Sequence, residues 1–270
     1  MDLFDRAAVK EKIDRAMGGI RHKILVLSGK GGVGKSTVAV QLAALLADRG
    51  RTVGLLDVDL HGPSLPKMLG LAGRRVEVAD GEILPVPYSP NLKVVSMALV
   101  LGDRDTAVIW RGPRKGGAIR QLLSDVRWGA LDFLIVDAPP GTGDEPLSIA
   151  KIIPGVRALV VTTPQEVAVE DVRRSLQFLK KLELPILGIV ENMSGLSCPH
   201  CGQEIDLFKK GGGQALAQEW AIPFLGRIPL EPRLVLAADS GQPFLGGRVE
   251  SPAARAFRAL ADAVVDQLAG

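Results

Sequence analysis

A glycine-rich run near the start of the chain constrains the fold more than any other feature. Residues 29–37 read GKGGVGKST and fit the pattern G-x-x-x-x-G-K-[ST]. A short apolar run at 24–27 precedes them, and apolar residues recur at helical spacing after them, at Val38, Leu42, Leu45 and Leu46. A buried strand therefore leads into a glycine loop that opens a helix, which is the setting that a phosphate-binding loop requires.

This loop contains the groups that bind a nucleoside triphosphate such as ATP. Its glycines let the backbone curl with the N–H groups pointing inward, and the N-terminus of the next helix adds partial positive charge. Lys35 can reach the β- and γ-phosphates, and Ser36 offers its hydroxyl to Mg²⁺. We predict that the nucleotide is bound by Gly29, Lys30, Gly31, Gly32, Val33, Gly34, Lys35, Ser36 and Thr37.

Lys30 follows the first glycine directly, as in the deviant form of the loop, K-G-G-x-G-K-[ST]. A lysine at this position cannot easily fold back onto the nucleotide of its own loop. In the deviant class it reaches across a dimer interface to the phosphates of the partner chain. We therefore expect Lys30 to act catalytically in trans, as the lysine counterpart of an arginine finger, the alternative being a solvated surface lysine.

Composition narrows the class of protein. The 270 residues, 47% hydrophobic and 23% charged, are enough for one large domain, and we divide them into a lead-in helix at 1–22 and a single ATPase domain at 23–270. A formal charge of +3 without a long basic run gives no reason to expect a nucleic-acid partner. No apolar run is long enough to span a membrane, and the N-terminus lacks the layout of a signal peptide. We expect a cytoplasmic protein with no membrane partner.

Carboxylates end two further apolar strands. The run 53–56 ends at Asp57 and Asp59, and the clearest central strand, 131–136, ends at Asp137. Because the carboxyl ends of parallel strands line the ligand crevice, these acids should lie beside the glycine loop. We predict that Asp57 holds a magnesium-bound water, that Asp59 orients the attacking water, and that Asp137 lies near Mg²⁺ as a Walker B acid. The alternatives are helix caps for the first pair and a plain strand-to-helix turn for Asp137.

Strands and helices alternate along the rest of the chain. The pattern predicts further strands at 92–96, 157–161, 186–190 and 222–228, a turn beginning at Pro229, a hairpin around 79–82, and helices at 115–126, 166–181, 211–220 and 252–268. This alternation predicts an α/β fold with a doubly wound, mostly parallel sheet flanked by helices. The last helix carries Asp262 and Asp266 on its polar face, so we expect it to pack on the domain rather than bind a membrane.

The two cysteines of the chain, Cys198 and Cys201, form a C-x-x-C pair on a loop bounded by glycine and proline. Thiolates at this spacing can hold one metal ion or one edge of an iron–sulfur cluster, but a four-thiolate site would need a second copy of the chain. His200, between them, would point differently. The leading interpretation is that the pair binds a metal ion or an iron–sulfur cluster. A zinc ion shared between two chains is one form of this interpretation. A redox dithiol and unreactive loop cysteines are the alternatives.

Five motifs in this order carry a family resemblance: 29–37, DVDLHGPS at 57–64, DAPPGTGD at 137–144, ENMS at 191–194 and CPHC at 198–201. With them the sequence resembles the Mrp-type (ApbC-like) iron–sulfur cluster carriers, relatives of the MinD and ParA ATPases, from about residue 22 to the end. The resemblance implies a homodimeric, weakly hydrolysing ATPase that holds a [4Fe-4S] cluster between two C-x-x-C loops. It would hand the cluster to apo iron–sulfur proteins and work with cluster scaffold or adaptor proteins.

The resemblance also implies a site for the adenine base. Asn192 would contact the base, and the loop at Pro229, Leu230 and Glu231 would cover it. Many members begin with a small extra domain, and some eukaryotic relatives have an N-terminal four-cysteine cluster, neither of which this sequence shows. Two other functions share the nucleotide motifs: a MinD- or ParA-like positioning ATPase acting on membrane or DNA, and a reductase whose two chains are bridged by a cluster.

Overall fold

A computed structural model describes residues 3–59, 62, 64–101, 112–141, 144–198, 200–242, 244 and 249–269. Its central sheet contains β1 (Ile20–Ser28), β2 (Val53–Asp57), β5 (Val86–Ser89), β6 (Leu92–Ser96), β7 (Leu131–Asp137), β8 (Val156–Thr162), β9 (Ile186–Ser197), β10 (Glu204–Ile205) and β11 (Phe224–Leu230). The helices are α1 (Leu3–Gly18), α2 (Lys35–Asp48), α3 (Leu65–Met68), α4 (Met97–Leu101), α5 (Gly112–Ser124), α6 (Asp144–Ile152), α7 (Glu166–Lys181), α8 (Gly212–Glu219), α9 (Pro232–Asp239) and α10 (Pro252–Ala269).

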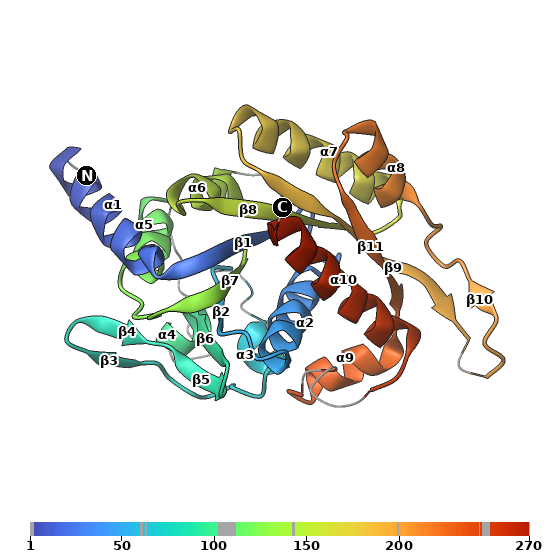
Figure 1. Ribbon diagram of the computed structural model, residues 1–270, viewed down its shortest axis with the longest axis horizontal. Coiled ribbons are helices and arrows are strands. Elements are labelled where there is room, and N and C mark those ends of the chain that lie inside the picture. The colour runs from blue at the N-terminus through green and yellow to red at the C-terminus, as the bar shows by residue number, and fades with distance from the viewer. Residues whose placement is uncertain are drawn as a thin grey trace.

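The predicted doubly wound sheet is confirmed. Among the described residues its strand order is β10-β9-β8-β1-β7-β2-β6-β5, and β11 pairs with β9 (Figure 1). The pairs from β9 through to β6 are parallel, as is β11 with β9, whereas β5 and β10 run antiparallel to their neighbours. Strand β1 leads into the glycine loop, and strands β2 and β7 end in acids. Because the three strands are parallel, their carboxyl ends lie on the same side of the sheet.

Two hydrophobic cores cover the two faces of this sheet. Alternate residues of β1 enter different cores: Ile24 and Val26 pack with α2, α3, α9 and α10, whereas Leu25 and Leu27 pack with α1, α5, α6, α7 and α8. Figure 1 shows α2 and α10 crossing the sheet on the side opposite α7 and α8. Because both faces are covered, the parallel strands are near-continuous apolar runs.

Several element boundaries differ from those predicted, among them those of β1, β9 and β11. β1 begins at Ile20 rather than after residue 22, so the sheet starts inside the segment assigned to the lead-in helix. β9 continues to Ser197 because β11 and β10 pair with its second half. β11 includes Pro229, which was expected to begin a turn. Among the described strands β11 pairs only with β9, so it is an edge strand. Proline lacks a backbone N–H group, and an edge strand tolerates it where that group would not pair with the neighbouring strand.

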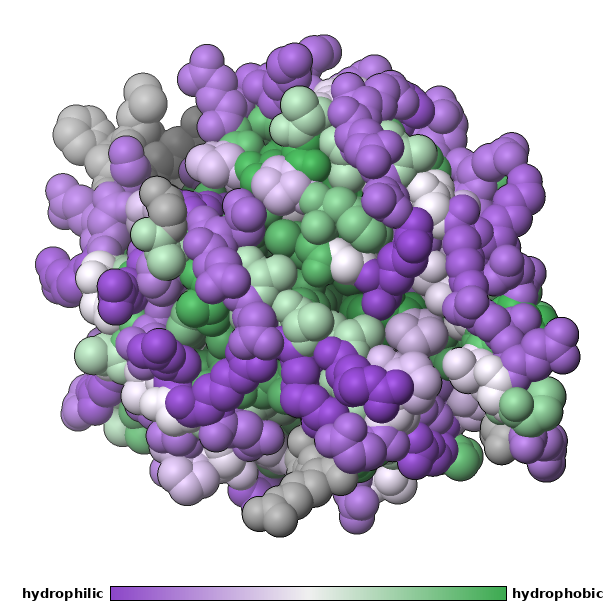
Figure 2. All heavy atoms as spheres, turned by 45° about the vertical axis from the view of Figure 1, so that its right-hand side comes forward, coloured by the Kyte–Doolittle hydropathy of each residue, from purple (hydrophilic) through white to green (hydrophobic). Residues whose placement is uncertain are grey.

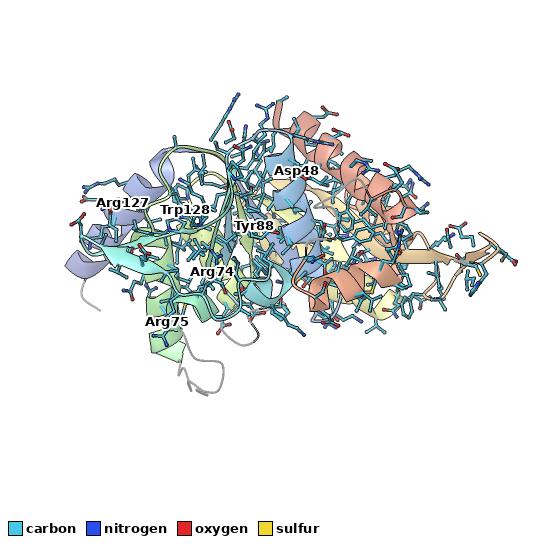
Figure 3. All side chains as sticks on the ribbon, turned by 90° about the horizontal axis from the view of Figure 1, so that it is seen from below. Asp48, Arg74, Arg75, Tyr88, Arg127 and Trp128 are labelled. Carbon is cyan, nitrogen blue, oxygen red and sulfur yellow. The ribbon has the colours of Figure 1, made fainter. Side chains whose placement is uncertain are left out.

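The expected hairpin is formed by β3 (Glu77–Ala79) and β4 (Glu82–Leu84). Its turn residues Asp80 and Gly81 both have positive φ, 54° and 77°, as a tight hairpin turn requires. Arg127, beside the buried Trp128, reaches the hairpin and pairs with Asp80 and Glu82 (Figure 3). The hairpin is thus fastened to the domain at the edge away from β9.

The surface is largely hydrophilic. On the face that carries the β10 end of the sheet, Figure 2 shows apolar side chains gathered in a central hollow with hydrophilic side chains around it. In the part of the chain that the structure describes, no helix combines the length and the apolar character needed to cross a bilayer.

Candidate nucleotide and thiolate sites

The glycine loop joins the carboxyl end of β1 to α2, as predicted. Gly34, the residue before α2, has φ 83°, the left-handed region in which glycine is favoured. A Cβ on Gly34 would overlap Nδ2 of Asn192, and a Cβ on Gly29 would stand 2.6 Å from the backbone of Asp171 in α7. The loop therefore needs glycine at both ends, partly because other elements approach it closely.

A buried ion pair lies at the start of α2. Nζ of Lys35 is 2.5 Å from Oδ1 of Asp137, the last residue of β7, and 3.3 Å from the hydroxyl of Ser36. Both charged side chains are almost completely buried, with exposed fractions of 6% and 1%. The predicted phosphate lysine and the predicted Walker B acid are therefore in direct contact.

A second buried carboxylate stands beside this pair. Asp57 is in register with Asp137 across β2 and β7. Its Oδ1 accepts a hydrogen bond from the backbone N–H of Asp59 at 3.0 Å, and its Oδ2 accepts one from the hydroxyl of Ser96 at 2.9 Å. Sequence reasoning missed Ser96, which is the last residue of β6 and so also faces the carboxyl edge of the sheet.

Burial controls the ionisation of the two acids. Burial, together with the charge on the neighbouring Asp137, raises the pKa of Asp57 to about 8. Burial also raises the pKa of Asp137, but the ammonium of Lys35 opposes that rise. At neutral pH we therefore assign the negative charge to Asp137, which has the cation, and the proton to Asp57.

These residues fit a magnesium ion. Oδ2 of Asp137 is buried without a hydrogen-bond partner among the described residues, which is costly for a carboxylate oxygen. A hard cation would satisfy that oxygen, and Mg²⁺ favours carboxylate, hydroxyl and water oxygens. The structure brings Ser36, Asp57 and Asp137 together at one place, as the sequence predicted for the metal. Asp59, half-buried, is close enough for its charge to raise the pKa of Asp137.

Asn192 contacts the glycine loop from β9, and Lys30 belongs to the loop itself. The buried Asn192 on β9 donates a hydrogen bond from Nδ2 to the carbonyl of Val33 at 2.9 Å. Lys30 is half-buried, and its carbonyl accepts a hydrogen bond from the hydroxyl of Ser28 at 2.9 Å. No described residue forms an ion pair with the Lys30 ammonium.

The cysteine pair lies where β9 turns back into β10. The backbone N–H of Cys198 donates a hydrogen bond to the carbonyl of Gln203 at 2.8 Å, and the N–H of Gly202 donates one to the carbonyl of Cys198 at 2.9 Å. Cys201 is exposed, Cys198 is partly so, and both thiols are free. The backbone N–H groups of Cys201 and His200, and the Cys201 thiol, lower the pKa of Cys198, which favours its thiolate.

The described residues form no complete metal site at this turn. Within the described residues no three cysteine, histidine or acidic side chains are grouped so that they could hold a metal ion. His200, between the two cysteines, is exposed. Three motif stretches extend beyond the described residues, at Leu60, His61 and Pro63, at Thr142 and Gly143, and at Pro199.

A pocket of about 330 Å³ joins the cysteine turn to the segment expected to cover the base. Cys198 and Ser197 line one side, and Pro229, Leu230, Glu231, Pro232, Arg233, Pro252 and Ala253 line the rest. In the sheet Ile228 pairs with Asn192 and Leu230 with Leu196. Residues 229–231 therefore lie between the asparagine at the glycine loop and the cysteines, an adjacency that no local sequence pattern indicates.

A family model described as "ParA: NUBPL iron-transfer P-loop NTPase" matches residues 19–265. The chain belongs to this family of iron-transfer P-loop NTPases. Its relatives include the iron–sulfur cluster carrier protein of Methanocaldococcus jannaschii, 48% identical over 96% of this chain and 89% of the relative. The cytosolic Fe-S cluster assembly factor NUBP2 of Homo sapiens is 48% identical over 93% of this chain and 94% of its own length.

Solved structures agree with the family assignment. A nucleotide-binding protein from Archaeoglobus fulgidus, in complex with ADP, has a TM-score of 0.77 and 38% identity, over 87% of this chain and 92% of that one. The septum site-determining protein MinD of Pyrococcus horikoshii, complexed with Mg-ADP, has a TM-score of 0.66 and 27% identity, over 93% and 98% of the two chains. The fold is therefore that of the MinD and ParA P-loop NTPases, a class that hydrolyses nucleotides.

Proposed function

We propose that this iron-transfer P-loop NTPase is a homodimeric carrier that binds ATP, hydrolyses it slowly, and passes a [4Fe-4S] cluster to apo-proteins. One observation carries the proposal: a single strand, β9, contacts the glycine loop at Asn192 and ends at Ser197, directly before the free thiol of Cys198. The names of the relatives, a cluster carrier and a cluster assembly factor, support the same cargo.

In the nucleotide site, residues 29–37 would hold the phosphates. Lys35 would exchange its contact with Asp137 for the β- and γ-phosphates, and Lys30 of the second chain would add a cation from outside. Magnesium, when bound, would neutralise phosphate charge, held by Ser36 and Asp137 with a water on Asp57. Asp59 would orient the attacking water. Asn192 would contact the adenine, and residues 229–231 would cover it.

In the cargo site, Cys198 and Cys201 of each chain would supply two thiolates to the cluster. The lowered pKa of Cys198 favours the deprotonated form that a metal requires. The exposed position of Cys201 suits a cluster that must leave for a recipient, or arrive from a scaffold or adaptor protein. Because several relatives are named cytosolic factors, we place this exchange in the cytoplasm.

Anaerobic reconstitution with iron and sulfide tests the proposal. Wild-type protein should gain absorption at about 400 nm, where iron–sulfur charge-transfer bands fall, with about four irons and four sulfides per dimer and without zinc. The double variant Cys198→Ser, Cys201→Ser should gain none, yet bind ATP normally. Lys35→Ala should lose ATP binding. A double-serine variant that holds as much cluster as the wild type would refute the cargo site, and normal ATP affinity in Lys35→Ala would refute the phosphate site.

A further inference from the structure

β9 is irregular between its contact with the glycine loop and the cysteines. From Asn192 to Leu196 it advances four positions, while β11 advances only from Ile228 to Leu230. Met193 and Gly195, within this stretch, have φ of 56° and 77°. The extra residues form a bulge, and a bulge bends a strand and re-aims the residues after it. A methionine in the left-handed region costs about 1 kcal/mol or more and persists only where the surroundings enforce it.

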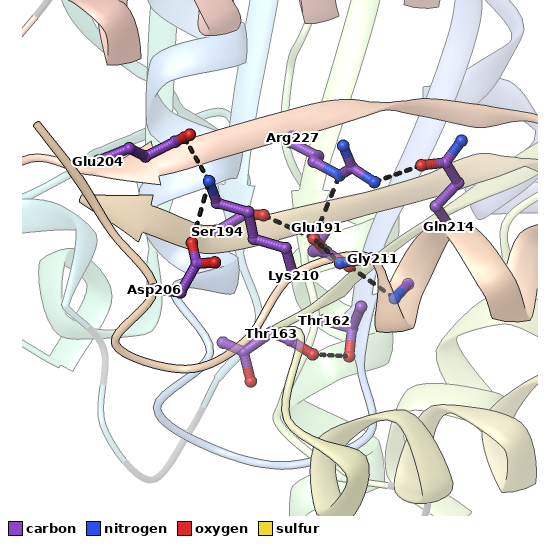
Figure 4. A network of polar contacts seen from close by, with 11 residues as sticks. Thr162, Thr163, Glu191, Ser194, Glu204, Asp206, Lys210, Gly211, Gln214 and Arg227 are labelled. Carbon is purple, nitrogen blue, oxygen red and sulfur yellow. Dashed lines mark hydrogen bonds and ion pairs between the residues drawn. The ribbon is translucent and has the colours of Figure 1, made fainter. Parts of the chain in front are cut away.

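A buried carboxylate, Glu191, contacts the bulge, and its side chain is inaccessible to solvent. Glu191 accepts hydrogen bonds from the hydroxyl of Ser194 at 2.6 Å and from the backbone N–H groups of Gly211 at 2.9 Å and Gly213 at 2.7 Å. Nε of Arg227 on β11 lies 3.5 Å from the same carboxylate (Figure 4). One side chain thus ties together the bulge, the start of α8 and the edge strand.

The segment from Cys201 to Gly211 returns to this carboxylate. Lys210, next to Gly211, forms ion pairs with Glu204 and with Asp206, the latter at 3.0 Å (Figure 4). Glu204 belongs to β10, which pairs with the end of β9. The two arms of the cysteine hairpin, residues 195–210, are therefore joined where β10 pairs with Leu196 and Ser197, and their base is fastened to Glu191 through Ser194 and Gly211.

The glycine loop contacts Asn192, the residue that follows Glu191. Asn192 donates to the carbonyl of Val33, and Gly34 lies so close that Asn192 leaves no room for a Cβ there. A rearrangement of the loop around phosphates must therefore move Asn192 or break its hydrogen bond. Because Glu191 precedes Asn192 directly, that movement acts at the point where the hairpin is held.

We propose that Glu191 is a positioning residue through which nucleotide in the glycine loop sets the orientation of Cys198 and Cys201. Its carboxylate holds the hairpin as one body, so that displacement of Asn192 turns the thiol-bearing tip instead of being absorbed at the bulge. This inference rests on the proposed function and assigns that function a route between its two sites. The bulge at 193–195 is the element with two arrangements, and nucleotide selects between them.

The test measures thiol alkylation in the cluster-free, full-length chain, with and without Mg·ADP, under conditions where the protein is monomeric. In wild-type protein ADP should change the alkylation rate of the cysteine pair by about fivefold or more, the usual lower range of coupling between sites. Glu191→Gln keeps the shape of the side chain but removes its charge. In that variant the ratio of the alkylation rates with and without ADP should fall to within about twofold of unity. The affinity for ADP should stay within about threefold of wild type.

Two further variants make the result specific. Glu219→Gln is the matched control, because Glu219 ends the same helix α8 and pairs with Arg173, away from the bulge; it should keep the wild-type ratio. Ser194→Ala removes only the hydrogen bond from the bulge to Glu191 and should lower the ratio partly. If Glu191→Gln does not fold, Ser194→Ala decides the question, and a wild-type ratio in that folded variant overturns the proposal.

Iron and sulfide loading, measured in parallel, separates this inference from the carrier function. The positioning role is overturned if folded Glu191→Gln keeps the wild-type ratio of alkylation rates. It is also overturned if ADP does not change the alkylation rate of the wild-type protein, even when that protein loads cluster. A wild-type protein that loads no cluster, but whose ADP response disappears in Glu191→Gln, overturns the carrier function and upholds the positioning role.

Discussion

Two buried acids and one buried lysine define the chemistry of the nucleotide site. Lys35 and Asp137 neutralise each other at a separation of 2.5 Å, whereas Asp57 is left without a cation of its own. A buried carboxylate without a cation is stable only when protonated, which is why burial raises the pKa of Asp57 to about 8. Folding of the nucleotide-free chain therefore takes up a proton at neutral pH.

The stability of the nucleotide-free chain should fall as pH rises. The pKa of Asp57 is higher in the folded chain, about 8, than its ordinary value of 3.8. Its contribution to the free energy of unfolding is therefore complete below pH 3.8 and is lost as the pH rises toward 8. Each pH unit in that interval removes about 1.4 kcal/mol at most. Thermal unfolding from pH 5 to pH 9 should show a falling Tm, and Asp57→Asn should flatten the fall and raise Tm at pH 9.

Asp132→Asn is the control for this pH dependence. The backbone N–H of Thr52 lowers the pKa of Asp132, so its contribution is lost only in acid and the slope between pH 5 and pH 9 should not change. An Asp57→Asn variant with the wild-type slope would show that Asp57 is ionised in the folded chain.

At the scale of elements, the glycine loop and the hairpin at the end of β9 are each shaped by neighbours. Gly34 and Gly32 both have positive φ, 83° and 81°, but only Gly34 meets another element, at Asn192. Gly32→Ala therefore introduces backbone strain alone, about 1 kcal/mol. Gly34→Ala adds a steric overlap, and we expect a loss of about 2–4 kcal/mol of unfolding free energy together with loss of nucleotide binding. Urea unfolding and nucleotide titration of the two variants test this; equal losses would contradict it.

The hairpin tip should carry an unusually acidic thiol. The backbone N–H groups of Cys201 and His200 lower the pKa of Cys198, so its alkylation rate should level off at a lower pH than that of a small reference thiol. Mass spectrometry of the peptide that contains Cys198, after brief alkylation across a pH series, gives the midpoint. In urea the midpoint should return to that of the reference thiol. The same midpoint in folded and unfolded chains would mean that the turn does not stabilise the thiolate.

At the scale of the whole molecule, the proposed function divides each site between two chains. Lys30 has no ion-pair partner among the described residues, and each chain supplies only two thiols at the hairpin tip. Two chains meeting face to face would complete both sites at once. Such an isologous arrangement makes the two nucleotide sites equivalent and dependent on each other.

Mixing two inactive variants tests this dependence. In the proposed dimer, Lys30→Ala would lack the trans cation, and Asp59→Ala would lack the acid that orients water in its own site. In a mixed dimer, the site on the Lys30→Ala chain has its own Asp59 and receives Lys30 from the other chain. An equal mixture should recover about a quarter of wild-type ATP hydrolysis, because about half of the dimers are mixed and each has one complete site. If the mixture is as inactive as its parts, Lys30 does not act in trans.

Sequence spacing alone was sufficient for the alternation of strands and helices, the glycine loop, and the acids at the ends of β2 and β7. Each of these is encoded by residues a few positions apart, through side-chain periodicity and the conformations that glycine permits. The contact of Gly29 with α7, the extension of β9 to Ser197 and the inclusion of Pro229 in β11 were decided only by tertiary structure.

Glu191 shows the physical reason for this division. In the sequence it is an acid after an apolar run, like Asp57 and Asp137, and its position alone suggests the same role at the nucleotide. The fold instead surrounds it with Ser194, Gly211, Gly213 and Arg227, and so makes it the anchor of the cysteine hairpin. Those partners lie up to 36 positions away, and long-range pairing depends on which strands meet, which is settled by burial of the whole sheet and not by local spacing.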